Sequence, residues 1–278
     1  MKPHPVVRES PADSDGPRAI QRVVSIANLL ARTESGATLA EIAAQIGAPK
    51  SSVHALMRAL VNLEMAVRKG ERYVLGPALF SLALAVQARY TMTTMARPFM
   101  QRLHEGSGET AILAALDRST SSLVYVDQIE SANPVRYTAT IGNPRPLYCS
   151  GAGRVLLAFQ DAPWREEYYA RGGFVPITTS TVTDVDEIRR KVDRARVDGF
   201  ATSVEEMTDG AASCAAPIFQ RDGSVSHSLM IATVAFRLRQ RGELFRSMVT
   251  SVANEFSRAL GYDGVLPGSS DDQRRAIL

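Results

Sequence analysis

Apolar residues recur at helical spacing in two short stretches of the first quarter of the chain. In each stretch they occupy positions i, i+3, i+4 and i+7, one face of an α-helix; they are Leu39, Ile42, Ala43 and Ile46, then Val53, Leu56, Met57 and Leu60. Thr38 and Glu41 form a capping-box pattern that fixes the start of the first helix. Gly-Ala-Pro at 47–49 predicts a tight turn. The pattern predicts a helix-turn-helix, whose second helix can enter the major groove of DNA.

A basic hairpin is predicted directly after the second helix. Residues 65–75 form two arms of alternating polarity around a turn at Gly70. Arg68, Lys69 and Arg72 lie near its tip, where they can contact phosphates beside a groove. An earlier apolar stripe predicts a third helix that closes the core; it consists of Ile20, Val23, Val24, Ala27 and Leu30. Each element alone is explained by ordinary core packing, but the ordered series is typical of a winged helix-turn-helix.

The second helix has a polar face, and the charge around it is positive. Ser51, His54 and Arg58 lie on that face. Residues 18–90 carry nine Lys/Arg and four Glu, a net charge of +5, which leaves −2 for the rest of the chain. Concentrated positive charge is what affinity for phosphates requires. A merely solvated basic face, or a winged helix that binds another protein, are the alternatives that this charge makes weaker.

Length and composition exclude several classes of protein. The 278 residues suffice for two domains, and no apolar run reaches the roughly 18–20 residues that span a bilayer. Residues 1–17 hold four prolines and no apolar segment, which predicts a disordered leader rather than a secretory signal. The two cysteines, Cys149 and Cys214, indicate a reducing compartment and therefore the cytoplasm.

A linker helix is predicted between the winged unit and the second domain. One stripe of residues 77–91 is apolar and consists of Leu79, Leu82, Ala83 and Val86. The stripe must pack on its own domain or on a second copy of the chain, and a dimer would read two half-sites. The expected organisation is a leader (1–17), a winged helix-turn-helix domain (18–76), a linker helix (77–91), a second domain (92–263) and a flexible tail (264–278).

Strand and helix patterns mix in the second domain. β-rich runs predict strands at 110–116, 123–129, 135–141, 201–204, 212–219 and 226–234. Helical spacing predicts helices at 95–105, 151–159, 186–198 and 243–260. Hairpin turns such as that at 221–223 favour an α+β domain with a largely antiparallel sheet.

The second domain has no recognisable catalytic or metal-binding motif. The four histidines lie far apart and none has metal-ligand spacing, so we expect neither a metal ion nor a cofactor. A hydrolase with Ser150 or Cys214 as its nucleophile is the alternative from another class, although no base is recognisable beside either residue.

Residues 147–158 look suited to a small ligand. Ser150 and the small residues after it open a helix, and the N–H groups at a helix start can bind a carboxylate. An equally supported alternative is that Ser150 only caps the helix and the glycines only allow close packing.

Several motifs together resemble the IclR family of bacterial transcriptional regulators. They are the helix-turn-helix at 39–54, the wing ending at 73–77, and the motifs at 107–110, 150–154 and 215–218. The likeness runs from about Arg18 to Tyr262. It implies an N-terminal winged helix-turn-helix, a linker helix, and a C-terminal effector-binding domain with a curved antiparallel sheet. It also implies a dimer or tetramer that represses or activates a catabolic operon by binding double-stranded operator DNA and a small organic effector.

Residue pattern and resemblance together give two candidate sites. The candidate operator contacts are Thr38, Lys50, Ser51, Ser52, His54, Arg58, Arg68, Lys69 and Arg72, of which His54 and Arg58 would read base edges. The candidate effector contacts are Ser150, Gly151, Ala152, Ser203, Ser213, Cys214, Met230 and Ala232. Ser203 replaces an acidic residue of the family, and Met230 and Ala232 replace small hydroxyl residues. Fewer polar groups favour an apolar or aromatic acid over a two-carbon acid.

Overall fold

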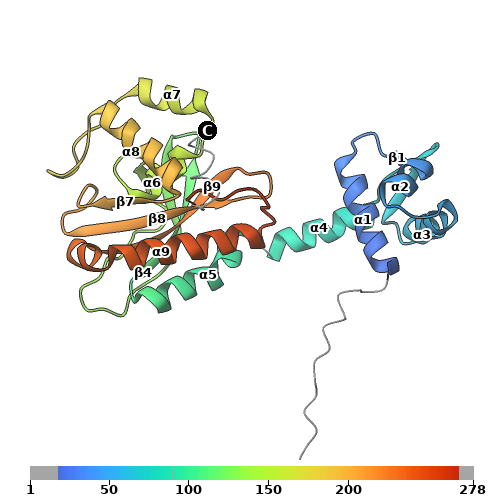
Figure 1. The fold of residues 1–278 in the computed structure, drawn as a ribbon, viewed down its shortest axis with the longest axis horizontal. Helices are drawn as coiled ribbons and strands as arrows, with labels where there is room; N and C mark the ends of the chain where they lie inside the picture. The colour runs from blue at the N-terminus through green and yellow to red at the C-terminus, as the bar shows by residue number, and fades with distance from the viewer. Residues whose placement is uncertain (1–17, 90, 269–278) are drawn as a thin grey trace, which may run out of the picture. The chain divides into compact units, whose positions relative to one another are not determined.

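The computed structural model describes residues 18–89 and 91–268, which form two compact units (Figure 1). Along the chain the first unit ends at Thr91 and the second begins at Met92. The predicted leader at 1–17, Tyr90, and the predicted tail from residue 269 onward lie outside the described residues. Among the residues described, no helix is both long and apolar enough to span a bilayer.

The N-terminal unit is a winged helix-turn-helix followed by the linker helix. Its elements are α1 (Arg18–Arg32), β1 (Ala37–Thr38), α2 (Leu39–Gln45), α3 (Lys50–Asn62), β2 (Ala66–Lys69), β3 (Arg72–Leu75) and α4 (Pro77–Arg89). The wing hairpin gains a third strand, because β1 pairs with β3 in the sheet order β1-β3-β2. Ile26, Ile42, Val53 and Met57 are fully buried in the core that the three helices share.

A capping box starts α2. The Thr38 hydroxyl accepts a hydrogen bond from the Glu41 N–H at 3.3 Å, and the Glu41 carboxylate accepts one from the Thr38 N–H at 2.7 Å. These bonds satisfy two N–H groups that the helix itself leaves without partners.

Replacing Thr38 by alanine should destabilise α2 by about 1 kcal/mol, because one of these N–H groups loses its acceptor. Hydrogen exchange of the α2 amides in the full-length chain measures the effect. A Thr38→Ser variant keeps the acceptor and should exchange at nearly the wild-type rate. Equal exchange in all three proteins would show that the cap does not contribute.

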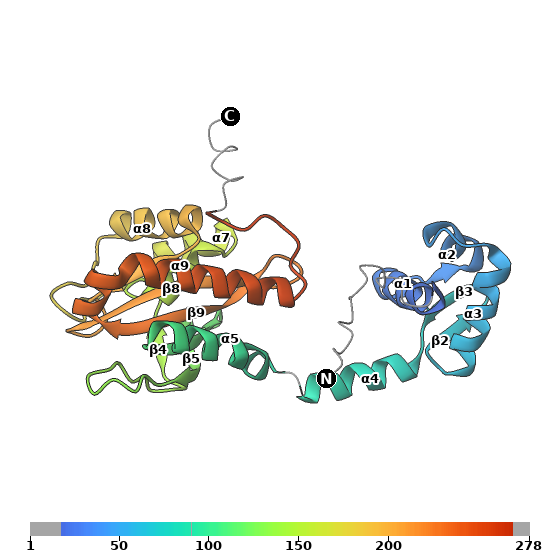
Figure 2. The same ribbon diagram turned by 60° about the horizontal axis from the view of Figure 1, so that its bottom comes forward.

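The C-terminal unit is a curled six-stranded antiparallel sheet with helices on both faces (Figures 1 and 2). The strand order β6-β5-β4-β9-β8-β7 is formed by β4 (Thr110–Asp117), β5 (Ser122–Ile129), β6 (Pro144–Pro146), β7 (Ala201–Val204), β8 (Ala211–Phe219) and β9 (Val225–Val234). One face packs on α5 (Met92–Ser107) and α9 (Ala235–Ala259). The other packs on α6 (Gly151–Ala158), α7 (Ala162–Arg171) and α8 (Val185–Asp198). The expected α+β class is confirmed.

Successive residues of the central strand β9 serve opposite faces of this sheet. Met230 and Ala232 belong to the core beneath α6 and α8, whereas Leu229 and Ile231 belong to the core beneath α5 and α9. Strand geometry requires this alternation. Both faces are therefore buried, which accounts for the nearly continuous apolar run of β9.

The predicted strand at 135–141 is wrong. The Gln128 side-chain amide donates to the Ala139 carbonyl at 3.1 Å and accepts from the Ala139 N–H at 3.0 Å. The Thr110 hydroxyl donates to the Tyr137 carbonyl at 2.7 Å. The described strand that pairs with the outer edge of β5 is instead β6. Side chains here replace the bonds of a ladder, so β-rich composition alone was misleading.

Other differences concern the end of the chain and one connection. The predicted helix at 243–260 begins earlier, at Ala235, and is kinked at Arg241, where the backbone leaves helical geometry (φ −122°, ψ 16°). Several charged residues precede the kink and interrupt the apolar pattern, so the sequence did not indicate the first part of α9. Helix α7 was not predicted. The first residues of the predicted flexible tail are packed, since Leu266 contacts the core that contains Ile188.

Candidate functional site

The outer face of α3 is polar and open, because its inner face is completely used by the core. Val53 and Met57 have no exposed surface, so the helix can rotate in neither direction without exposing apolar groups. The side chains that remain exposed on the outer face include Lys50, Ser51, His54 and Arg58. The helix-turn-helix geometry directs such a face toward a groove.

Two of the candidate operator residues outside the β2–β3 hairpin, Ser52 and Thr38, have partners inside the unit. Ser52 is half-buried, and its hydroxyl accepts a hydrogen bond from the Arg22 guanidinium of α1 at 3.2 Å. The Thr38 hydroxyl is occupied by the capping box. Both residues therefore orient α3 and α2 within the unit, and neither offers a side chain as free as those of His54 and Arg58.

The wing carries three basic residues with different surroundings. Lys69 is exposed at the hairpin tip, and Arg68 is exposed with its Nε donating to the Gly70 carbonyl at 2.9 Å. Arg72 points back to the unit: its guanidinium donates to the Gly36 carbonyl at 3.0 Å and to Glu41 at 3.1 Å. Contact of Arg72 with phosphate stays a prediction, because its side chain is still 41% exposed. Arg72 braces the hairpin against β1 and α2.

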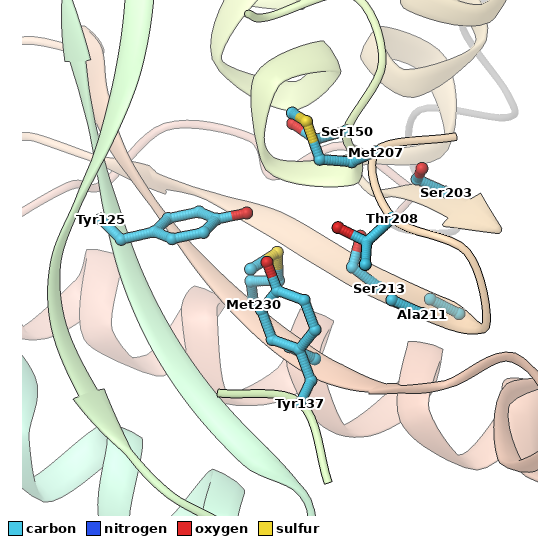
Figure 3. A pocket seen from close by; sticks show the side chains of 11 residues that line it. Tyr125, Tyr137, Ser150, Ser203, Met207, Thr208, Ala211, Ser213 and Met230 are labelled. Carbon is cyan, nitrogen blue, oxygen red and sulfur yellow. The ribbon is translucent and has the colours of Figure 1, made fainter. Parts of the chain in front are cut away.

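A cavity lies in the C-terminal unit between the sheet, the start of α6 and the β7–β8 loop (Figure 3). Its free volume is about 30 Å³, and the wider empty space around it, which includes open solvent, is about 320 Å³. Its lining consists of Tyr125, Tyr137, Ser150, Ser203, Met207, Thr208, Ala211, Ala212, Ser213, Met230 and Ala232. The structure thus brings together five of the candidate effector residues, namely Ser150, Ser203, Ser213, Met230 and Ala232.

Three candidate effector residues do not line this cavity. Cys214 is buried among the residues that face α5 and α9, because it follows Ser213 on β8 and adjacent strand residues face opposite ways. Its assignment to the effector site is corrected for that reason. Ala152 is buried in the core beneath α6. Gly151 lies directly beside the lining, since a Cβ atom there would be 3.0 Å from the Ser213 hydroxyl oxygen.

The cavity is neutral, with hydroxyl and thioether groups in its wall. The lining contains no charged side chain. The Tyr125 hydroxyl points toward the middle of the cavity (Figure 3). Burial raises the pKa of Tyr125 and the nearby Tyr137 hydroxyl raises it further, so Tyr125 remains a neutral hydrogen-bonding group. Met207 and Met230 contribute polarizable sulfur, which makes favourable contacts with aromatic rings.

Sequence reasoning missed six residues of the lining: Tyr125, Tyr137, Met207, Thr208, Ala211 and Ala212. Tyr125 lies within a correctly predicted strand, and its alternation with Val124 and Val126 was the available signal. Ala211 and Ala212 begin β8, whereas Tyr137, Met207 and Thr208 lie in irregular segments. No periodicity marks the inward-facing residues of such segments, so the sequence contained no signal for them.

Ser150 caps α6 at the edge of the cavity. Its hydroxyl accepts a hydrogen bond from the Gly153 N–H at 3.0 Å. The first N–H groups of a helix have no acceptor within the helix, and they carry the positive end of the helix dipole. Those of Gly151 and Ala152 lie at the start of α6, next to the neutral cavity. A carboxylate is the kind of ligand group that such a helix start can bind.

Neither cysteine has the lowered thiol pKa of an activated nucleophile. Burial raises the pKa of the Cys149 thiol to about 12 and that of the Cys214 thiol to about 12. A thiol with so high a pKa is almost entirely protonated near neutral pH, and the thiolate is the reactive form. Within the described part of the chain, no group of three His, Cys, Asp or Glu side chains could hold a metal ion.

Comparison with known proteins covers both units. The model of the IclR helix-turn-helix domain matches residues 19–70, and that of the bacterial transcriptional regulator IclR C-terminal domain matches residues 85–258. The HTH-type transcriptional regulator KipR of Bacillus subtilis is 27% identical over 247 residues, which cover 88% of this chain and 98% of KipR. The transcriptional repressor IclR of Escherichia coli is 25% identical over 260 residues, covering 92% and 94%. The crystal structure of Thermotoga maritima IclR superposes with a TM-score of 0.59 and 25% identity, covering 88% and 99%.

A winged helix-turn-helix joined to an effector-binding domain defines a ligand-responsive transcriptional regulator. The chain belongs to the IclR family of bacterial transcriptional regulators. The predicted family is therefore confirmed. The hydrolase alternative is rejected, because the family and these relatives are transcriptional regulators and not enzymes.

Proposed function

We propose that two copies of the winged unit of this regulator bind a pseudo-palindromic operator. The binding of an organic acid then lowers or raises the affinity for that operator. The observation that carries the proposal is the exposed polar face of α3 above a fully buried apolar face. His54 and Arg58 would read base edges, with Ser51 beside them, while Lys50, Arg68 and Lys69 would hold phosphates. The site of action would be the cytoplasm, where the chromosome lies.

Replacing Arg58 by alanine should weaken operator binding by about 1–3 kcal/mol if Arg58 contacts a base. Fluorescence anisotropy with the DNA next to the protein's own gene measures this loss. Replacing the phosphate-contacting Lys69 should weaken binding to all sequences alike. Unchanged binding by Arg58→Ala would remove Arg58 from base recognition.

The linker helix supports an assembly of two or more copies. Phe80 and Leu82 of α4 are 67% and 58% exposed, and Leu84 and Val86 are also exposed. Large apolar side chains gathered on one helix are costly in water and mark an interaction surface. A second copy of α4 is the occupant that a two-fold operator requires. Sedimentation equilibrium should find a dimer or tetramer. A monomer at micromolar concentration would contradict binding of the operator by two copies of the chain.

The effector would be a small acid with an aromatic body. The start of α6 is an anion-binding feature beside the cavity, and the cavity lining itself carries no charged side chain. A carboxylate at Ser150–Ala152 would leave its ring among Met207, Met230 and Tyr137. Calorimetric titration with benzoate, 4-hydroxybenzoate, pyruvate and glyoxylate tests this preference. We expect the two aromatic acids to bind at least tenfold more tightly, and tighter binding of glyoxylate would contradict the aromatic assignment.

Regulation requires that the acid bind two states of the assembly with different affinity. The proposed sequence is that the acid fills the cavity, the preferred state changes, and the spacing of the two winged units changes with it. A catabolic operon is the target that an organic-acid effector suggests.

A further inference from the structure

Arg154 is a buried cation that lies outside the cavity lining. It is only 2% exposed, although its guanidinium carries a positive charge at any physiological pH. Its Nε donates to the Tyr148 carbonyl at 3.0 Å and its Nη1 to the Thr202 carbonyl at 3.0 Å. The guanidinium also forms a two-pronged ion pair with Glu206, with Nη1 at 2.9 Å from Oε1 and Nη2 bonded to Oε2. Four of the five N–H donors of Arg154 thus have acceptors at a buried position.

The acceptors of Arg154 belong to three different segments, and each segment supplies part of the cavity wall. Tyr148 lies two residues before Ser150, and Thr202 is next to Ser203 on β7. Glu206 directly precedes Met207 in the β7–β8 loop. One planar side chain therefore fixes the mutual spacing of three walls. A lysine, with a single nitrogen on a flexible stem, cannot span these acceptors.

The β7–β8 loop is held in an uncommon conformation beside this ion pair. Glu205 has a left-handed backbone (φ 58°), which is unfavourable for a residue with a side chain. The Thr178 and Thr181 hydroxyls donate to the Glu205 and Glu206 carbonyls at 2.6 and 2.7 Å. Lys191 adds a second cation 3.3 Å from the Glu206 carboxylate. Strained backbone persists only where its surroundings over-determine it, and such places cluster at ligand sites.

We propose that Arg154 and Glu206 are the positioning residues of the effector cavity. The pair sets the distances among the start of α6, β7 and the β7–β8 loop. It thereby fixes the positions of Ser150, Ser203 and Met207 in the cavity wall. This assignment rests on the proposed function, in which that cavity holds the effector. Neither residue touches the acid itself.

Hydrogen exchange of the full-length protein tests the proposal with Arg154→Lys, Glu206→Gln and the double variant. We expect exchange at least tenfold faster in residues 148–150 and 201–211 of each single variant, with β4 and α9 unchanged. Because the two residues act as one unit, the double variant should exchange no faster than the more affected single variant. The matched control is Arg189→Lys, which alters the two-pronged Arg189–Glu166 pair between α8 and α7, outside the lining.

The pattern of exchange separates positioning from general stabilisation. Faster exchange spread evenly over the domain, additive effects of the two substitutions, or the same local change in Arg189→Lys would each overturn the proposal. If Arg154→Lys does not fold, Glu206→Gln alone decides by the same local criterion. The measurement uses neither DNA nor acid, so failure of the acid titrations would refute the effector assignment while leaving this result to stand.

Discussion

Replacing Arg237 by alanine should lower the free energy of unfolding of the effector-binding domain by about 3–5 kcal/mol. Arg237 donates to both carboxylate oxygens of Glu109, at 2.6 and 2.9 Å, and to the Val135 carbonyl at 2.8 Å. Glu109 is completely buried, so the variant would leave its carboxylate unpaired in the interior. Urea unfolding followed by the fluorescence of Trp164, the single tryptophan, reports on this domain.

The control for this prediction is an ion pair of the same type at the surface. Arg102 and Glu255 are about half exposed and lie 2.8 Å apart. Water already solvates such groups, so Arg102→Ala should leave the urea midpoint of unfolding nearly unchanged. If the two variants unfold at the same urea concentration, the buried Arg237–Glu109 pair contributes no more to the free energy of unfolding than the surface pair does.

Replacing Gly153 by alanine should destabilise the same domain by about 3 kcal/mol, at the upper end of the cost of overpacking. A Cβ atom at this position would be 2.2 Å from the Leu147 carbonyl oxygen and 2.6 Å from its Cα. Both are backbone atoms, so the start of α6 would have to move away from the segment that carries Ser150. Urea unfolding reported by Trp164 measures the loss, and titration with benzoate measures the accompanying change at the cavity.

Gly242 provides the matched control within a helix of the same domain. A Cβ atom there would meet nothing within 4 Å, and its backbone does not have a positive φ. Gly242→Ala should therefore be neutral or slightly stabilising, because alanine favours helix over glycine. A loss of stability as large as that of Gly153→Ala would show that close packing is not the cause.

The helices and strands were largely predictable from sequence because their signals are local. The capping box at Thr38 and Glu41, the turn at Gly47, and the apolar stripes of α2 and α3 all lie within a few residues of the elements they specify. Strand β9 was recognisable for the same reason. By contrast, the segment at 135–141 is held by Gln128 and Thr110, and the sequence pattern does not indicate such distant side-chain bonds.

The cavity was predictable only in part, because its wall depends on tertiary structure. Ser213 and Cys214 were both candidates, yet neighbouring residues of a strand face opposite ways and only Ser213 lines the cavity. The inward direction of Tyr137 and Met207 follows from irregular backbone. Arg72 and Lys69 look equivalent in the sequence, but only the structure places Gly36 and Glu41 beside Arg72.

We expect the outer face of α3 and the wing to bind duplex DNA. Titration of the full-length protein with the DNA beside its own gene, at 50 and 200 mM salt, tests it most directly. Lys50, Arg68 and Lys69 from two copies would give about six phosphate contacts, so affinity should fall roughly a thousandfold between the two conditions. Failure to retain any duplex at the lower salt, or an affinity that does not depend on salt, would contradict the claim.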